Sequence, residues 1–164
     1  MFLETEAFRT VVASTPLVSI DLLVRNEAGQ LLLGRRTNRP AQGCWFTPGG
    51  RICKNEGLDA AFRRISEAEL GRSFERSRAR LLDVYEHFYA DSVFGDGEQD
   101  PSTHYVVLGY LLEIDGGDAL NPPADQHDGY RWWSPEAIRA SADVHANTRD
   151  YLAAIERMPR RAGA

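Results

Sequence analysis

Lysine is almost absent from this chain, and cysteine is scarce. Lys54 is the single lysine among 19 basic residues. The high number of arginines therefore does not by itself indicate a phosphate site, and only the position of an arginine in the chain can do so. The two cysteines, Cys44 and Cys53, have neither the spacing of metal ligands nor that of a redox pair. We therefore expect two free thiols in a reducing compartment.

Long apolar runs, an excess of positive charge and internal repeats are also missing. No run approaches the roughly 20 apolar residues of a membrane span, and we expect no signal peptide, which favours a cytoplasmic protein that does not bind membranes. The net charge of −5 argues against a non-specific nucleic-acid binder. With no change of composition along its 164 residues, the chain predicts a single domain, 1–164, whose end, 159–164, is frayed.

Five stretches have the alternation or the apolar content of β-strands. They lie at 17–24, 31–33, 81–89, 103–114 and 130–133. The stretch 103–114 is apolar on both faces, so it should be a central strand. Two hairpin strands followed by a turn, a third strand and a helix favour an α+β fold over a regular βαβ repeat.

The segments between these strands predict helices and two long loops. Helices are expected at 5–14, capped by Thr5, after the cap Ser134, and at about 144–157. Residues 90–102 are acidic and Gly-rich without periodicity, which is typical of a mobile loop or lid. Residues 115–129 form the second loop and carry the triplet Gln126-His127-Asp128.

The rest of the chain is organised around the stretch 45–72. Its glycine pair, Gly49-Gly50, marks a tight turn where backbone can approach a ligand. Apolar residues then recur at helical spacing and predict one buried stripe, made of Leu58, Ala61, Phe62, Ile65 and Ala68. We expect Asn55 as the N-cap, Glu56 in the first turn and Gly71 just past the C-terminus of this helix.

Part of this stretch, 50–72, resembles the Nudix box of pyrophosphate-cleaving hydrolases. Five residues match the box in type and spacing: Gly50, Glu56, Arg64, Glu69 and Gly71. The usual box places three carboxylates on one helix face. This chain has Ile65 and Ala68 at two of those positions and keeps only Glu69. The resemblance implies a Nudix α/β/α sandwich with a mixed β-sheet.

Three further stretches, 37–43, 103–109 and 126–128, together with the altered box, resemble the GDP-mannose mannosyl hydrolases within that family. The resemblance runs from Phe2 to about Tyr151. It implies that water attacks C1 of the sugar with inversion and releases GDP and mannose, with tolerance for GDP-glucose. It also implies Mg²⁺ as the cofactor, with Mn²⁺ as a substitute, and a homodimer.

The same resemblance assigns a metal site and a base. Glu69, the Gly49 carbonyl and Gln126 would be the protein ligands of the metal, and an all-oxygen set of this kind suits Mg²⁺ or Mn²⁺. His127 would be the general base, because an imidazole with a pKa near 6.5 can accept a proton at neutral pH. Glu56 and Arg64 would form an ion pair that holds the loop to the helix.

The remaining assignments concern substrate contacts. Arg36, Arg51 and Tyr105 would bind the diphosphate, since guanidinium groups match phosphate oxygens. Asp21 would bind sugar hydroxyls or the guanine edge, and His87 is a second substrate contact. Three N-terminal residues would lie near the guanine, with hydrophobic capping of the domain as the open alternative: Phe2, Leu3 and Phe8.

Two other functions remain open from the sequence. An ordinary Nudix pyrophosphohydrolase would cut a P–O bond of a nucleotide sugar. A non-catalytic Nudix domain would bind a sugar nucleotide without turnover; Ile65 and Ala68 fit it, whereas Glu69 and His127 argue against it.

Overall fold

The computed structural model describes residues 3–123 and 127–159 of the chain. Its elements, in chain order, are α1 (Thr5–Ser14), β1 (Leu17–Arg25), β2 (Leu31–Arg36), β3 (Trp45–Phe46), β4 (Gly49–Arg51), α2 (Leu58–Leu70), the 3₁₀ turn η1 (Arg76–Arg78), β5 (Ala79–Tyr89), β6 (Thr103–Glu113), β7 (His127–Trp133), α3 (Pro135–Ala140), α4 (Ala146–Asp150) and α5 (Leu152–Arg157).

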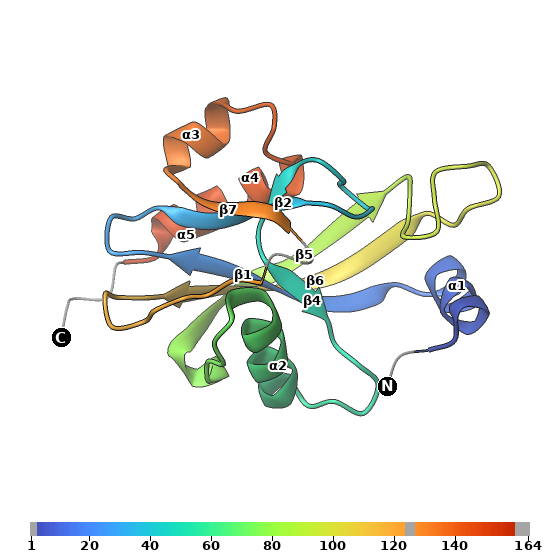
Figure 1. Ribbon diagram of the computed structural model, residues 1–164, viewed down its shortest axis with the longest axis horizontal. Coiled ribbons are helices and arrows are strands. Elements are labelled where there is room, and N and C mark those ends of the chain that lie inside the picture. The colour runs from blue at the N-terminus through green and yellow to red at the C-terminus, as the bar shows by residue number, and fades with distance from the viewer. Residues whose placement is uncertain (1–2, 124–126, 160–164) are drawn as a thin grey trace.

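Within the described residues, the strands form one mixed, twisted sheet (Figure 1). Five strands run across it in the order β3-β2-β1-β6-β5, while β4 pairs with β1 and β7 pairs with β2. The pair β1 and β6 is parallel, from Leu17 opposite Tyr105 to Arg25 opposite Glu113. The other strand pairs are antiparallel. The mixed sheet and the central position of the 103–114 strand are thus confirmed.

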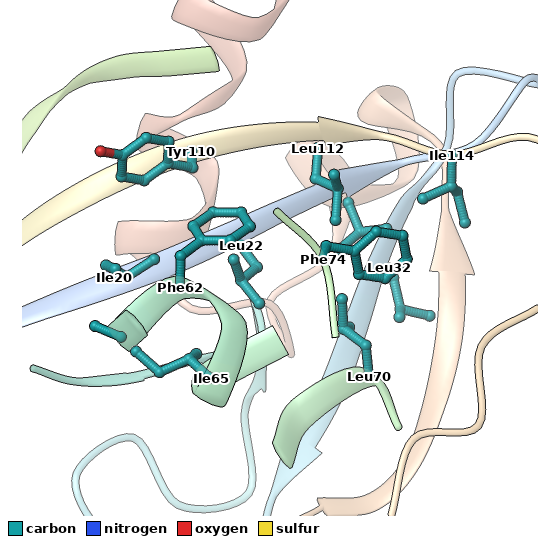
Figure 2. Packing of buried hydrophobic residues seen from close by; sticks show 12 residues of the cluster. Ile20, Leu22, Leu32, Phe62, Ile65, Leu70, Phe74, Tyr110, Leu112 and Ile114 are labelled. Carbon is teal, nitrogen blue, oxygen red and sulfur yellow. The ribbon is translucent and has the colours of Figure 1, made fainter. Parts of the chain in front are cut away.

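Helices cover both faces of the sheet, as the sandwich prediction requires. Figure 1 shows α2 on one face and α3, α4 and α5 on the other. On the α2 side, Phe62 and Ile65 pack against Ile20 and Leu22 of β1 (Figure 2), and the Phe62 ring lies 5.4 Å from the Tyr110 ring. The opposite core joins α3 and α5 to β1, β2 and β6 through a second cluster of buried side chains. Among the described residues, no helix is long and apolar enough to cross a membrane.

Two local signals in the sequence are confirmed at the ends of helices. Gly71 ends α2 in the left-handed region, with a φ of 67°, where glycine carries no steric penalty. Ser134 caps α3, since its side chain accepts a hydrogen bond from the Ala137 N–H at 3.2 Å. Both signals depend only on neighbouring residues, which is why the sequence reveals them.

The predicted start of α2 is wrong. Gly57 is the N-cap, without a side-chain cap bond, and Glu56 lies before the helix rather than in its first turn. Asn55 has a φ of 64°, a left-handed turn conformation in place of the extended conformation of a cap. The reason is that the Glu56 carboxylate accepts from the Cys53 N–H at 2.9 Å and closes a turn ahead of the helix.

The predicted apolar stripe of α2 is wrong at its two ends. Leu58 and Ala68 are exposed, whereas Ser66 and Glu69 are buried. The buried face is therefore rotated, because Ser66 packs toward the following loop and its hydroxyl accepts from the Phe74 N–H at 2.9 Å. Ala68 instead lines a cleft beside the sheet.

Three further boundaries differ from expectation. Glu4 rather than Thr5 is the N-cap of α1. The single C-terminal helix expected at 144–157 is two helices, α4 and α5, which meet at the fully buried Tyr151. The triplet at 126–128 does not lie wholly in a loop, since β7 begins at His127, where the backbone pairs with Arg36 of β2. The frayed end expected at 159–164 lies, apart from Pro159, outside the described residues.

The loop 90–102, expected as a mobile loop or lid, is tied to both of its neighbours. Arg39 forms ion pairs with Asp91 at 3.1 Å and Asp96 at 2.7 Å. On the other side, Arg9 of α1 pairs with Asp100 at 3.1 Å, and the Phe8 ring lies 5.6 Å from the Phe94 ring. The loop therefore connects the segment around Arg39 with α1, and its mobility stays a prediction.

Candidate active site

A cleft of about 900 Å³ opens between α1, α2 and the strands β1, β4, β5 and β6. Nine of the twelve predicted site residues line it: Leu3, Phe8, Asp21, Arg36, Gly49, Arg51, Glu69, His87 and Tyr105. The other three predictions, Phe2, Gln126 and the side chain of His127, lie outside the described residues. The fold thus gathers residues from seven elements, far apart in the sequence, around one open space: α1, α2, β1, β2, β4, β5 and β6.

Glu69 and Gly49 define one wall of the cleft. Glu69 sits one residue before the end of α2 with only 4% of its surface exposed. At Gly49, a Cβ would come within 2.6 Å of both the Asp21 Oδ1 atom and the Ile20 carbonyl. Only glycine lets β4 lie this close to β1, and Gly49 lines the same cleft as Glu69.

These donors fit a single hard cation. Glu69 and Asp21 are the acids that line the cleft, and the described residues contain no group of three His, Cys, Asp or Glu side chains that could hold a metal. One carboxylate and one backbone carbonyl would leave most positions of a Mg²⁺ ion to water or to phosphate oxygens, which is how this ion is usually bound.

The predicted ion pair between Glu56 and Arg64 is confirmed. Both carboxylate oxygens of Glu56 accept from Arg64 at 2.7 Å, and this pairing lowers the pKa of Glu56 to about 2. Arg64 also donates to the Arg51 carbonyl at 2.8 Å. The pair therefore fastens α2 to the turn before it and to β4, which carries Arg51 into the cleft.

Two arginines that were assigned to the diphosphate do line the cleft. The Arg51 guanidinium lies 4.0 Å from the centre of the Phe8 ring, so α1 covers the side of the cleft at β4. Arg36 comes from the end of β2, donates from Nε to the Pro40 carbonyl at 2.8 Å and lies over the Phe46 ring at 5.8 Å. Guanidinium groups held in this way are suited to bind a diphosphate between them.

The floor of the cleft holds buried titratable groups. Asp21 is 6% exposed, and burial raises the pKa of its carboxyl to about 7 against the opposing effects of a hydrogen bond from Tyr151 and the charge of Arg36. His87 is 4% exposed, and burial, with a smaller effect of His145, lowers the pKa of its imidazole to about 4. At neutral pH His87 is therefore uncharged, and Asp21 is close to its titration midpoint.

Two tyrosines, one behind this floor and one lining the cleft, were not identified from the sequence. Tyr151 donates a hydrogen bond to Asp21 Oδ2 at 2.7 Å. Tyr89 lines the cleft, and its hydroxyl accepts from the Asn147 side chain at 3.1 Å. Burial also raises the pKa of Tyr89 and Tyr105 above the usual range, so both hydroxyls stay protonated and can donate. Nothing in the local pattern around Tyr151 distinguishes it from an ordinary core residue.

The backbone of His127 lies at the edge of this site. It is the first residue of β7, and its Cα pairs in register with that of Arg36, which lines the cleft. The proposed base and the proposed phosphate ligand therefore share one end of the β2–β7 ladder.

A family model and two named proteins match most of this chain. The NUDIX domain model matches residues 15–155. The low-salt glycan biosynthesis protein Agl8 of Haloferax volcanii is 41% identical over 110 residues, which are 67% of this chain and 67% of that protein. The ADP-ribose pyrophosphatase of Methanocaldococcus jannaschii is 27% identical over 103 residues, which are 63% of this chain and 54% of that protein.

Solved structures share the fold. The MutT NUDIX hydrolase from Burkholderia pseudomallei aligns with a TM-score of 0.67 and 27% identity, covering 89% of this chain and all of that chain (100%). The NUDIX domain of Shewanella oneidensis NrtR, solved as a complex with ADP ribose, aligns with a TM-score of 0.65 at 16% identity, covering 94% of this chain and 92% of that chain. A family model that spans most of the sequence and this shared architecture lead to one conclusion: the chain belongs to the Nudix family of hydrolases.

Proposed function

We propose that this Nudix hydrolase cleaves GDP-mannose, with tolerance for GDP-glucose, between C1 of the sugar and the diphosphate. The observation that carries the proposal is the composition of α2 along the cleft. Glu69 is the carboxylate that α2 contributes, while Ile65 and Ala68 line the cleft where a full Nudix box has two more acids. A helix that brings one carboxylate to the cleft is poorly equipped to hold several ions and direct a metal-bound hydroxide at phosphorus.

The relatives support a substrate that joins a nucleoside diphosphate to a sugar. One is named for glycan biosynthesis, a second acts on ADP-ribose, and a third protein of the same fold binds ADP ribose. The identity of the base and the sugar comes from the resemblance of the stretches 37–43, 103–109 and 126–128 to GDP-mannose mannosyl hydrolases.

The diphosphate would be the leaving group. Arg36 and Arg51 would bind its oxygens with charge-assisted hydrogen bonds, and the Tyr105 hydroxyl would donate a further one. Glu69, the Gly49 carbonyl and Gln126 would hold Mg²⁺, whose charge would neutralise the departing GDP. Phe8 and Leu3 line the same cleft and would cover the guanine end, together with Phe2. Because diphosphate is already a good leaving group, no general acid is required.

The attack on carbon would need a base and a defined sugar position. His127 would deprotonate a water on the face of the sugar opposite the diphosphate, as in an inverting glycosidase. Asp21 and His87, at the buried floor of the cleft, would bind sugar hydroxyls and fix C1 between the water and the leaving group. The α-linked sugar would therefore be released as the β-anomer.

A homodimer is the assembly we propose. The edge strand β5 exposes three apolar side chains, Leu81, Val84 and Phe88, at 47%, 51% and 66% of their surface. A second copy of the chain would cover these three side chains, since contiguous exposed apolar surface marks interaction sites. Light scattering on the purified protein should give twice the chain mass; a monomer would remove this part of the proposal.

Hydrolysis in ¹⁸O-labelled water tests which bond breaks. Purified enzyme, GDP-mannose and Mg²⁺ should give mannose that carries the label and GDP that does not, as read by mass spectrometry. Unlabelled mannose kept in the same water for the same time controls for exchange at C1. Proton NMR during the first turnovers should show β-mannose before the anomers equilibrate.

Each other outcome points to a different reaction. Label in a phosphate, or GMP and mannose 1-phosphate as products, would replace the proposal with ordinary Nudix pyrophosphohydrolysis. Label in α-mannose released first would keep cleavage at carbon but require a covalent intermediate. Binding of GDP-mannose without any product would indicate a non-catalytic sensor domain.

A further inference from the structure

Tyr151 connects two cleft residues without touching the cleft itself. It lies where α4 meets α5, is fully buried and is not among the cleft-lining residues. Its hydroxyl donates to Asp21 Oδ2 at 2.7 Å and lies 3.4 Å from His87 Nε2. Asp21 comes from β1 and His87 from β5, so one hydroxyl bridges side chains of two strands that are separated by β6.

The sheet makes room for this tyrosine at a single position. Gly109 of β6 is the Cα partner of Asp21. A Cβ on Gly109 would lie 3.1 Å from Tyr151 Cε1 and 3.0 Å from Tyr85 Cε2, close enough to force both rings to shift. The two rings pack edge to face with their centres 4.5 Å apart. Glycine weakens the middle of a strand, and here it permits the close approach of Tyr151 to the sheet.

The hydrogen bonds also fix the state of His87. A tyrosine hydroxyl has one hydrogen and two acceptor lone pairs. When Asp21 is ionised, that hydrogen goes to Asp21 at 2.7 Å, and the oxygen of Tyr151, 3.4 Å from His87 Nε2, is left to accept from the Nε2–H of His87. His87 then carries its proton on Nε2 and keeps Nδ1 as an acceptor. The chain from His87 through Tyr151 to Asp21 therefore sets the tautomer of one cleft residue and the orientation of the other.

We propose that Tyr151 is a positioning residue, which holds Asp21 and His87 as one rigid unit that recognises the hydroxyl groups of the sugar in the nucleotide sugar. This inference rests on the proposed function for the identity of the substrate. Both residues line the cleft, and in this proposal they offer the sugar two acceptors at fixed places relative to each other. Vicinal hydroxyls match such a pair, whereas the nucleotide portion binds elsewhere in the cleft and is independent of it.

The test compares Tyr151→Phe with a matched variant of the neighbouring ring, Tyr85→Phe. Tyr151→Phe keeps the ring and removes the bridging hydroxyl. We expect kcat/KM for GDP-mannose to fall about tenfold to a hundredfold, while the inhibition constant of GDP changes less than about twofold. Tyr85 does not line the cleft, so Tyr85→Phe should leave both values unchanged. Equal losses in GDP binding and turnover would overturn the inference.

A double-mutant cycle separates positioning from a purely structural effect. In the Asp21→Ala background the bridge has already lost one end, so adding Tyr151→Phe should cost less than about threefold. A structural role of Tyr151 would give additive losses, and additivity would refute the proposal. Gly109→Ala keeps the hydroxyl but shifts its ring, and it should lower kcat/KM in the same direction by a smaller factor.

A measurement that does not require catalysis, the tautomer of His87, tests this inference separately from the proposed function. Nitrogen-15 NMR of the imidazole should show the Nε2–H tautomer of His87 in the wild type and in Tyr85→Phe, and a mixed tautomer in Tyr151→Phe. An unchanged tautomer in Tyr151→Phe would refute the positioning role. If the wild-type enzyme releases no product from GDP-mannose, the proposed function fails, and the tautomer still decides the role of Tyr151.

Discussion

The variant Asp21→Asn should be more stable than the wild type at alkaline pH, although Asp21 lies in the candidate active site. Burial raises the pKa of Asp21 from 3.8 to about 7. A carboxyl whose pKa is higher in the folded state binds its proton more tightly there than in the unfolded chain. Its contribution to stability is therefore fully present below about pH 4 and is lost as the pH rises to about 7.

The size of the effect follows from the width of that window. Each unit of pKa difference corresponds to about 1.4 kcal/mol. Between pH 5 and pH 7 the unfolded chain has already released this proton while the folded protein still holds it. Because the folded protein itself starts to release the proton near pH 7, the free energy of unfolding of the wild type falls by about 2 kcal/mol over these two units because of Asp21. Asparagine has no proton to lose, and its amide oxygen can still accept the hydrogen bond from Tyr151.

Urea unfolding of the wild type and Asp21→Asn at pH 5 and pH 8.5, in EDTA, measures this difference directly. The stability of Asp21→Asn relative to the wild type should rise by about 3 kcal/mol between the two pH values. His87, whose depressed pKa acts in the opposite direction below about pH 6.5, is present in both proteins, so its contribution cancels. Parallel curves for the two proteins would show that Asp21 titrates normally and that its burial does not control its charge.

Three further predictions concern the metal site and the base. Glu69→Gln should lower Mg²⁺ affinity and activity together at least tenfold, because an amide lacks the charge that holds the ion; unchanged metal dependence would exclude Glu69 as a ligand. Ile65→Glu should cost about 3 kcal/mol or more in urea unfolding and Ala68→Glu less than about 1, because only Ile65 is buried, and neither should raise turnover of GDP-mannose; a faster variant would place the reactive water on α2. His127→Gln should lower kcat by about 10² to 10⁴ with little change in KM, and a loss of only a few-fold would place the base elsewhere.

The sequence predicts those parts of the fold that depend on short-range rules. The cap at Ser134 and the left-handed end of α2 at Gly71 each involve only neighbouring residues. The central position of β6 could be predicted because a strand covered on both faces has apolar side chains on both. The Glu56–Arg64 pair could be predicted because the spacing of the Nudix box brings a loop acid back to the helix.

The limits of α2 show what such rules miss. Helical spacing identifies an apolar stripe, but it does not show which residues of the stripe pack in the core and which border a cleft. Ala68 has the right spacing but is exposed, because it lines the cleft. Ser66 is polar and buried, because the loop after the helix supplies a backbone N–H as its partner. Whether each of these two residues is buried therefore depends on parts of the chain outside the helix, which the spacing within the helix does not reveal.

The floor of the cleft was harder still to predict, since its organisation depends on contacts between distant residues. The hydrogen bond from Tyr151 to Asp21 spans 130 positions in the sequence. The glycine that makes room for it, Gly109, lies on a third element, and in the sequence alone it indicates only a weakened strand. Only the assembled sheet shows that the three positions are one feature.

The two altered positions of the Nudix box have different physical consequences, and the difference bears on the chemistry. Ile65 belongs to the core, and a Cβ on Gly50 would lie only 3.2 Å from its Cγ1 atom. An acid at this position would have to be buried among the apolar neighbours of the glycine turn. Where the usual Nudix box has a metal-binding acid, Ile65 therefore packs in the core. Ala68 is exposed to the cleft and leaves space without supplying a charge. Glu69 is then the carboxylate that α2 offers there. If Glu69 binds the metal as we propose, the base of the reaction has to come from another element. That requirement favours attack on carbon with a histidine base, because a single ion and arginines suffice to stabilise a departing diphosphate.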